Sequence, residues 1–259
     1  MTEQLTAAGS GVAVLYRDAQ LLGLYKPSGL PTTSPDGKRC LTELAAQLDP
    51  GAPRLHASSR LDAEVTGVVT FARTSQAIEA LLAARKAGRY ERYYLAIAGR
   101  APEPTSGSWH WSIATDPREP RRRIALDPGS SKGDRAESGY RVLGVAHEAA
   151  LLVLRPKTGR THQLRVHAAR AGAPLLGDRH YGGAMQRTLT NGRVLRAGRV
   201  MLHCARVRLP HIAERRRDAA PVCIDAPLPE DFRSLWLQLG GGASALDPQA
   251  WAADDTPER

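Results

Sequence analysis

The sequence predicts an α+β protein, because short strand-like segments and short helices alternate irregularly along its 259 residues. A regular strand–helix–strand alternation would instead have indicated a Rossmann-type parallel sheet. The 42% of apolar and 24% of charged residues are typical of a globular protein with a substantial core. We expect residues 12–239 to form the folded domain, residues 1–11 a flexible N-terminus, and residues 240–259, rich in Gly, Ala, Asp and Pro, a disordered tail.

Apolar runs separated by turn residues locate the individual elements. Strands are predicted at Val12–Tyr16, Leu21–Tyr25, Gly67–Phe71, Tyr93–Ala98, Tyr140–Val145, Ala150–Leu154, Val200–Leu209 and Val222–Ala226. Helices are predicted at Thr42–Leu48, from Thr74 or Ser75 to Gly88, from Thr161 to Gly172, and at Asp231–Leu239. Thr74 or Ser75, and Thr161, are the expected N-caps of their helices. The stretch 101–139, rich in Pro, Gly and Arg, predicts irregular hairpins or a flexible arm.

Charge and cysteine content limit the class of protein. Lys and Arg number 36 against 26 Asp and Glu, a formal charge of +10, which favours nucleic acid or another polyanion as partner. Cys40, Cys204 and Cys223 lie far apart and form no Cys-x-x-Cys pair, so neither a disulfide framework nor a zinc knuckle is indicated. Met1–Arg17 does not read as a secretory signal, and no apolar run approaches the roughly 20 residues of a membrane span. We expect a soluble cytoplasmic protein.

The stretch 155–182 contains the densest group of functional residue types. Lys157 and Arg160 lie at a Gly turn before a predicted helix, where they are well placed to bind phosphates. Arg165 borders the apolar face of that helix, so we expect it to meet a buried carboxylate and to keep that carboxylate ionised. A salt bridge at the helix border, with solvated cations around it, is the alternative interpretation.

Two further segments carry candidate catalytic groups. Arg60 and Asp62 lie in a polar bend before a buried strand, where Asp62 is either a nucleophile or general base, or a turn residue. Tyr93 and Tyr94 are adjacent in a strand and therefore face opposite sides. One ring is expected to join the core and the other to face a cleft, unless both simply pack.

Several other interpretations fail on residue spacing. His147-Glu148 is not followed by the second His of a zinc-protease helix. His162 and His167 are five residues apart, on different helical faces, and make a poor pair of metal ligands. Lys157-Thr158-Gly159 has the wrong order for a phosphate-binding P-loop. We therefore predict no metal site.

Together these segments resemble the motifs of the RluA-type pseudouridine synthases, which isomerise uridines in ribosomal or transfer RNA. That family carries His-Arg-Leu-Asp-x-x-Thr-Ser-Gly, Lys-x-Tyr-x-Ala, Thr-Gly-Arg-Thr-His-Gln-Ile-Arg-Val-His and Gly-Asp-x-x-Tyr-Gly. The corresponding segments here are Ser59–Gly67, Arg92–Ala96, Thr158–His167 and Gly177–Gly182. The similarity extends to the segments Leu21–Leu30, Arg135–Leu143, Val200–Arg208 and Ala226–Phe232, and thus covers residues 12–239.

The resemblance implies a pseudouridine synthase fold, with a central mixed, largely antiparallel sheet, flanking helices and a catalytic cleft. It implies Asp62 as the catalytic nucleophile, Tyr94 as the active-site tyrosine and Arg165 as the partner of the aspartate. Asp62 would attack either the ribose C1′ or the uracil ring, in a reaction that needs no cofactor because no redox step or group transfer occurs. RNA-binding residues are expected at Arg60, which would replace the flipped uridine in the stack, and at Lys157, Arg160, His162, Gln163 and His167.

Departures from the family pattern leave alternatives open. Ser59 replaces His, Val65-Thr66 replaces Thr-Ser and Arg92 replaces Lys, changes that bear on substrate choice and rate. The N-terminus is short for the S4 domain that some relatives carry, so we expect RNA to bind to the protein's own basic face, with Arg118–Arg123 as an arm. A monomer is the default expectation for the oligomeric state. The main alternative is a non-catalytic RNA-binding or RNA-folding protein on a degenerate synthase scaffold. A weaker one is a carboxylate-dependent hydrolase of a glycosidic bond.

Overall fold

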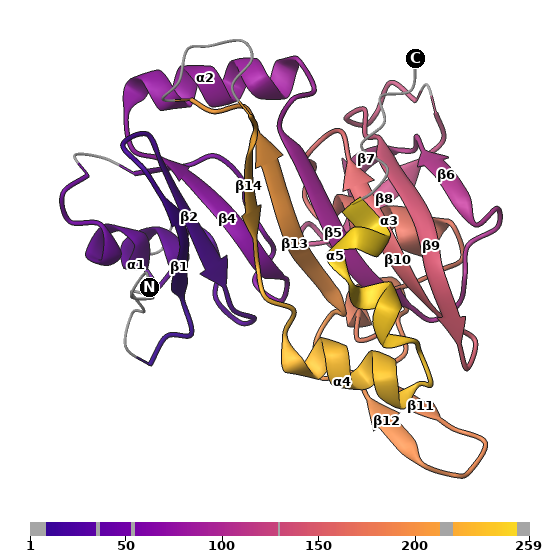
Figure 1. Cartoon of the computed structure of the whole chain (residues 1–259). Helices are drawn as coiled ribbons and strands as arrows, with labels where there is room; N and C mark the ends of the chain where they lie inside the picture. Colours follow the sequence, from indigo (N-terminus) through magenta and orange to yellow (C-terminus); the bar gives the residue numbers. More distant parts are fainter. Residues whose placement is uncertain (1–8, 35–36, 53–54, 129, 213–219, 253–259) are drawn as a thin grey trace. The chain divides into compact units, whose positions relative to one another are not determined.

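The computed structural model describes residues 9–34, 37–52, 55–128, 130–212 and 220–252. The chain folds as two compact units, each built from two separate segments of sequence (Figure 1). The first unit comprises residues 1–92 and 203–227, and the second comprises residues 93–202 and 228–259. The predicted α+β class with a mixed, largely antiparallel sheet is confirmed.

The sheet of the first unit contains the strands on either side of the predicted aspartate. Its neighbouring strands are, in order, β1 (Ala13–Arg17), β2 (Leu21–Lys26), β4 (Thr66–Ala72) and β13 (Leu202–Leu209). Two short strands complete it, β3 (His56–Ala57) beside β4 and β14 (Val222–Asp225) beside β13. The β4–β13 pair is parallel, whereas β1–β2, β2–β4, β3–β4 and β13–β14 are antiparallel. All seven residues of β4 are buried, as the apolar pattern of this predicted strand requires.

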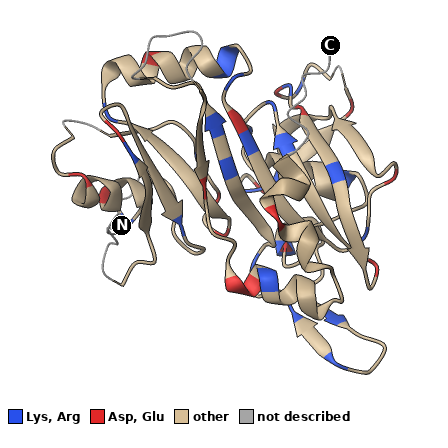
Figure 2. Cartoon of the chain, viewed as in Figure 1, with Lys and Arg blue, Asp and Glu red and all other residues tan. Residues whose placement is uncertain are grey.

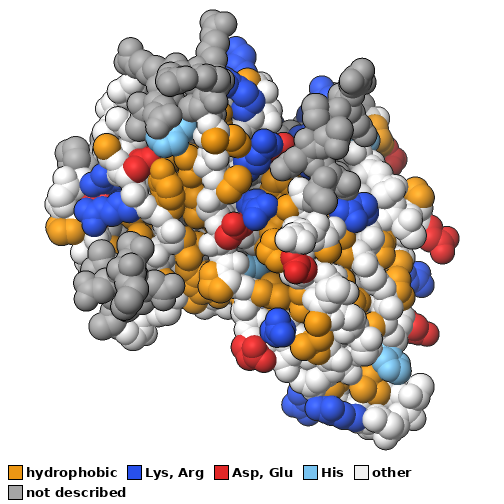
Figure 3. Space-filling model, in the orientation of Figure 1, with side chains coloured by type: hydrophobic (Ala, Val, Ile, Leu, Met, Phe, Trp, Pro, Cys, Tyr) orange, Lys and Arg blue, Asp and Glu red, His pale blue; other side chains and the backbone are white. Residues whose placement is uncertain are grey.

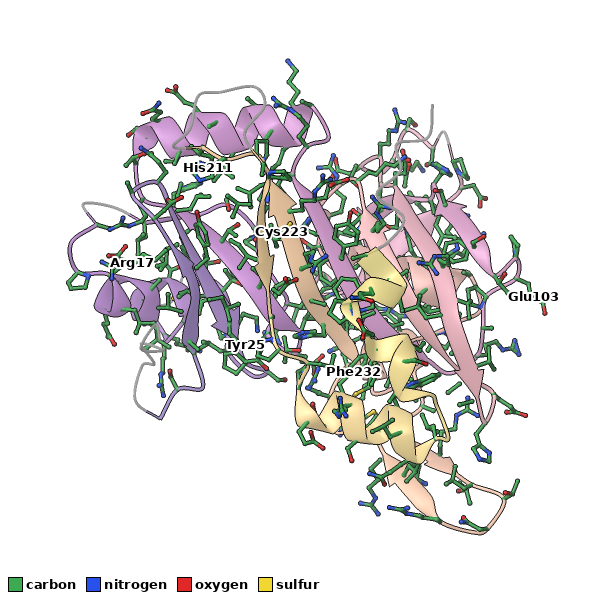
Figure 4. All side chains as sticks on the ribbon, viewed as in Figure 1. Arg17, Tyr25, Glu103, His211, Cys223 and Phe232 are labelled. Atoms are coloured by element: carbon green, nitrogen blue, oxygen red, sulfur yellow. The ribbon has the colours of Figure 1, made fainter. Side chains whose placement is uncertain are left out.

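Two helices of the first unit, α1 (Leu41–Leu48) and α2 (Ser75–Lys86), agree with the prediction. Thr74 is the N-cap of α2, because its side chain accepts a hydrogen bond from the Ala77 amide at 3.1 Å. The loop that follows α1 is fixed by the buried Asp49 carboxylate, which pairs with Arg73 at 2.6 Å and with Arg17 at 2.7 Å (Figure 4 labels Arg17). Asp49 thus joins α1 to the ends of β1 and β4.

The long strands of the second unit pair in antiparallel fashion, and one of them carries the predicted tyrosine. The strands are, in order, β5 (Glu91–Ala98, entering this unit at Tyr93), β10 (Ala149–Pro156), β9 (Ser138–Ala146) and β6 (Ser106–Trp109). Two separate hairpins are β7 (Ser112–Thr115) with β8 (Arg123–Leu126) and β11 (Gln186–Thr188) with β12 (Val194–Arg196). One hairpin, β7–β8, therefore forms within the stretch 101–139, where the turn residues predicted hairpins or an arm.

Helix α3 (Gln163–Arg170) departs from the predicted pattern in two ways. Its first six residues are all buried, so it is surrounded by protein and is not an amphipathic surface helix. The prediction of Thr161 as N-cap is wrong: His162 holds that position in a left-handed conformation, φ 57°, without a side-chain cap. The Gln163 side chain closes the turn instead, because its Oε1 accepts from the Arg160 amide at 2.9 Å.

The predicted disorder of residues 240–259 is wrong for residues 240–252. After α4 (Glu230–Gln238) the chain forms a 3₁₀ turn, η2 (Ala243–Leu246), and helix α5 (Pro248–Ala252). Trp251 is only 4% exposed, its ring lies 6.3 Å from that of Tyr93, and its indole N–H donates to the Leu246 carbonyl. One large aromatic side chain thus anchors a segment whose average composition is small and polar. Residues 253–259, and residues 1–8 of the predicted N-terminus, lie outside the described residues.

Candidate active site

Asp62 lies in the loop between β3 and β4, with its side chain partly exposed, and Arg60 in the same loop is exposed. The loop is a tight turn, since the Val65 amide donates to the Asp62 carbonyl at 3.1 Å. The structure therefore presents both predicted side chains on one short, turn-stabilised segment of the first unit. Such a segment can hold a carboxylate at a fixed position while leaving it accessible to a substrate.

The loop that follows β2 binds the backbone on both sides of Asp62. Thr32 Oγ1 donates to the Leu61 carbonyl at 2.9 Å and accepts from the Leu61 amide at 3.0 Å, so both backbone groups of the preceding residue are fixed. The Gly29 amide donates to the Ala63 carbonyl at 2.8 Å, which fixes the following residue. Both neighbours of Asp62 are thus held by one loop, a contact that the sequence pattern did not indicate.

Lys26 reinforces this attachment from inside the protein. Its side chain is fully buried, and its ammonium group donates to the carbonyls of Pro27 at 2.9 Å, Leu30 at 2.7 Å and Ala63 at 2.9 Å. A buried lysine is tolerated only when its donors are satisfied, and three carbonyls satisfy them here. Lys26 therefore ties the loop after β2 to the residue that follows Asp62.

The exit from the Asp62 loop is fixed by contacts with β13. Thr66 Oγ1 lies 2.9 Å from Nδ1 of His203, a fully buried side chain. The next residue, Gly67, has φ 119°, and a Cβ there would collide with the backbone of Cys204. Glycine is required because the two strands approach each other so closely. Thr66 is one of the residues that depart from the family motif, and it takes part in this contact between the Asp62 loop and β13.

Tyr94 lies in β5 of the second unit, opposite Leu154 of β10. Both adjacent tyrosines are buried, Tyr93 at 1% and Tyr94 at 4% exposure. The hydroxyl of Tyr93 accepts from Arg155 Nη2 at 3.2 Å, and the Arg155 guanidinium lies 4.8 Å from the ring centroid. Tyr93 is therefore a packing residue with a cation over its ring. Tyr94 is buried as well, so its candidacy for catalysis rests on the resemblance of Arg92–Ala96 to the family motif.

Arg165 of α3 meets a buried carboxylate, as predicted, and the structure identifies Asp178 as one such partner. The contact is bidentate: Nε lies 2.8 Å from one carboxylate oxygen and Nη2 lies 2.8 Å from the other. The side chains are 3% and 0% exposed. Asp178 belongs to the motif segment Gly177–Gly182, but its spacing from Arg165 gave no signal that the two would meet.

Gln163 and His167 have internal roles in this structure. Gln163 Nε2 donates to the Glu137 carbonyl and to Ser138 Oγ, each at 2.9 Å. His167 is fully buried, with Nδ1 3.0 Å from Ser138 Oγ and Nε2 2.9 Å from the Trp111 carbonyl. Burial lowers the pKa of His167, because the charged ring would lose its hydration. The prediction that these two side chains contact RNA directly is not supported, since their polar atoms bond to the protein interior.

The remaining predicted RNA-binding residues of this segment lie at or near the surface. Lys157 is exposed and pairs with Glu137 at 2.7 Å, and Arg160 lies 3.7 Å from Asp134. The hydrogen bond from Lys157 is the main cause that lowers the pKa of Glu137, whose carboxylate therefore stays ionised beside the cations. His162 is partly buried, and its Nδ1 lies 2.7 Å from the hydroxyl of Tyr181.

Basic side chains are spread over the surface. On the face in Figure 3 they are scattered among polar and apolar groups, and Figure 2 places further Lys and Arg along β13 and on the β11–β12 hairpin. Two of those on β13 are paired, Arg206 with Asp225 at 2.6 Å and Arg208 with Glu91 at 2.9 Å. Within the described ranges we find no cluster of three His, Cys, Asp or Glu suited to a metal ion, and no helix long and apolar enough to cross a membrane.

The fold defines the class of protein. Two human proteins, RNA Pseudouridylate Synthase Domain Containing 4 and Domain Containing 1, have similar structures, with TM-scores of 0.67 and 0.63. Each is 24% identical in sequence, and the matches cover 88% and 87% of this chain and 92% and 86% of theirs. The architecture is therefore that of the pseudouridine synthases.

Sequence comparison gives the family. An uncharacterized RNA pseudouridine synthase of Zymomonas mobilis is 33% identical over 227 residues, 86% of this chain and 96% of that protein. Ribosomal large subunit pseudouridine synthase D of Xylella fastidiosa is 32% identical over 250 residues, 92% of this chain and 72% of that protein. The family described as RNA pseudouridylate synthase matches residues 20–170, and the chain belongs to this family. The resemblance to RluA-type synthases is confirmed, and the protein is an isomerase that acts on RNA.

Proposed function

We propose that this pseudouridine synthase modifies specific uridines in structured ribosomal or transfer RNA, with Asp62 as the nucleophile. The observation that carries the proposal is the attachment of the Asp62 loop: Thr32 and Gly29 bond to the backbone on either side of Asp62, and Lys26 bonds to the residue after it. A carboxylate that must attack one atom of a bound nucleotide needs such fixed placement.

The reaction breaks the bond between ribose C1′ and N1 of uracil and forms a bond between C1′ and C5. Asp62 forms a transient bond to ribose C1′ or to the uracil ring, and this bond is broken again before the product leaves. The proton on C5 leaves and N1 gains one, so atoms and electrons balance without an oxidant, reductant or second substrate. Because the base must leave the helical stack before it can rotate, the exposed Arg60 is proposed to occupy the space that it vacates. Tyr94 is proposed to contact the base and to assist loss of the C5 proton, and Arg165 to keep the reaction's carboxylate ionised.

Three narrower features belong to the same proposal. The proposed substrate class is supported by the names of relatives such as the ribosomal large subunit synthase D of Xylella fastidiosa and the dual-specificity RNA pseudouridine synthase RluA of Escherichia coli K12, the latter 28% identical over 204 residues. RNA phosphates are proposed to bind the exposed cations Lys157 and Arg160. The protein is proposed to act as a monomer in the cytoplasm.

Pseudouridine mapping on unmodified ribosomal and transfer RNA transcripts tests the proposal. Wild-type protein should create new chemical-labelling stops at specific uridines, and Asp62→Asn should create none while binding RNA as tightly. Glu64→Gln is the matched control, because it removes a negative charge from an exposed position of the same loop. Full activity of Asp62→Asn would refute its role as nucleophile. RNA binding by the wild type without any stop would favour the non-catalytic alternative.

A further inference from the structure

The turn Gly177–Gly182 presents a carboxylate to Arg165 at a defined angle. A bidentate pair fixes the plane of a guanidinium as well as its position, which a single contact does not. Here both oxygens of Asp178 are used, on Nε and Nη2, and both side chains are almost completely buried. Arg165 therefore has its plane set by a residue thirteen positions further along the chain.

The turn itself is rigid. The Asp178 amide donates to the Leu175 carbonyl at 3.1 Å, and the Asp178 carbonyl accepts from Tyr181 at 3.2 Å and from Gly183 at 2.8 Å. A Cβ at Gly177 would collide with the carbonyl of Arg199, so this backbone path is available to glycine alone. Asp178 is thus held by its own backbone, independently of its ion pair.

Tyr181, from the same turn, contacts the guanidinium from another direction. The Arg165 Cζ atom lies 5.1 Å from the centroid of the Tyr181 ring, within the range of a cation–π contact. The ring is 7% exposed, and its hydroxyl lies 2.7 Å from His162 Nδ1 and accepts from the Arg123 amide at 3.0 Å. The hydroxyl contacts hold the ring in place, and the ring limits the movement of Arg165.

We propose that Asp178 and Tyr181 are positioning residues that fix the guanidinium of Arg165 for the isomerisation. The inference rests on the proposed function, in which Arg165 acts on the reaction's carboxylate. A gain in stability does not explain this ion pair, because a buried ion pair adds little to the free energy of unfolding compared with apolar residues of similar volume. A fixed guanidinium plane, by contrast, is what a group acting through directed hydrogen bonds requires.

A double-mutant cycle tests the coupling, with the single-turnover rate of tritium release from RNA labelled at uridine C5 as the readout. Asp178→Asn should lower this rate about 10- to 100-fold, with the dissociation constant for RNA changed less than about 2-fold. In an Arg165→Lys background the same change should lower the rate less than about 3-fold, because the bidentate contact is already lost. Tyr181→Leu should behave likewise, and Tyr181→Phe, which keeps the ring, should recover part of the rate.

Asp49→Asn is the matched control, because Asp49 is a buried carboxylate that pairs with Arg73 through the same Nε and Nη2 atoms, outside the proposed site. It should lower the urea midpoint and leave the rate within about 2-fold. Two outcomes would overturn the inference and leave the proposed function standing. In the first, Arg165→Lys is slow but Asp178→Asn and Tyr181→Leu keep the wild-type rate. In the second, each of these two substitutions lowers the rate by the same factor in the Arg165→Lys background as in the wild type. If Asp178→Asn does not fold, the Tyr181 variants alone decide. Full activity of Arg165→Lys would overturn the role of Arg165, and the inference with it.

Discussion

Thr32→Val removes a buried hydroxyl and keeps the shape of the side chain. In the folded protein this hydroxyl bonds to both backbone groups of Leu61, at 2.9 and 3.0 Å, and the two residues are 3% and 7% exposed. Each buried backbone group that loses its partner costs about 1–3 kcal/mol, so the substitution should lower the free energy of unfolding by about 2–6 kcal/mol. Because Leu61 precedes Asp62, the rate of pseudouridine formation should also fall, by about 10-fold or more.

Thr32→Ser is the matched control, because it keeps the hydroxyl and removes only a methyl group, at a cost of about 1 kcal/mol. Urea denaturation gives the free energies of unfolding, and single-turnover assays at low urea, where each variant is folded, give the rates. The reasoning predicts that the valine variant is both less stable and slower than the serine variant. Equal stability and equal rates of the two would show that the hydroxyl does not fix the Asp62 loop.

Two further predictions concern the packing around the same elements. Gly67→Ala should lower the free energy of unfolding by more than about 3 kcal/mol, since φ is 119° and the Cβ would collide with Cys204; Gly51→Ala, which meets open space, should change it by less than about 1 kcal/mol in the same urea titration. Burial lowers the pKa of His167, so the unfolded chain binds a proton that the folded protein does not, and stability should decline as the pH falls through about 6.5. Urea midpoints between pH 7.5 and 5 should therefore decline less for His167→Gln than for wild type, and an unchanged slope would contradict the assignment.

Elements whose type and burial follow from their own residues were predictable from sequence. The run Gly67–Phe71 has no polar alternation, and β4 is indeed buried throughout. Thr74 or Ser75 was predicted as the cap of the helix that follows, and the structure selects Thr74, whose side chain accepts from the Ala77 amide. The segments that carry Arg60, Asp62 and Arg165 were found in the same way, from residue types in local order.

Residues whose role depends on a distant partner were not predictable. Lys26 lies in the segment Leu21–Leu30 and was given no role of its own, yet it is fully buried, and three carbonyls accept hydrogen bonds from its ammonium group. Asp178 was noted only as part of the motif segment Gly177–Gly182, although it binds Arg165. In the tail, disorder was predicted from the average composition of residues 240–259. That average concealed Trp251, which has enough apolar area to order the segment around it. A local pattern does not record which tertiary contacts a side chain will make.

The two units hold their predicted catalytic side chains by the same physical means. In the first, Thr32 and Lys26 bond to the backbone on either side of Asp62 and so fix the position of that residue. In the second, Asp178 and Tyr181 fix Arg165 from a turn that is itself held by backbone bonds. A residue that only positions another adds nothing to the affinity for RNA, because it makes no contact with it. Substitutions of Thr32 and Asp178 should therefore lower the rate of the chemical step and leave RNA binding unchanged. Substitutions of exposed cations such as Lys157 should instead weaken RNA binding and reduce its dependence on salt.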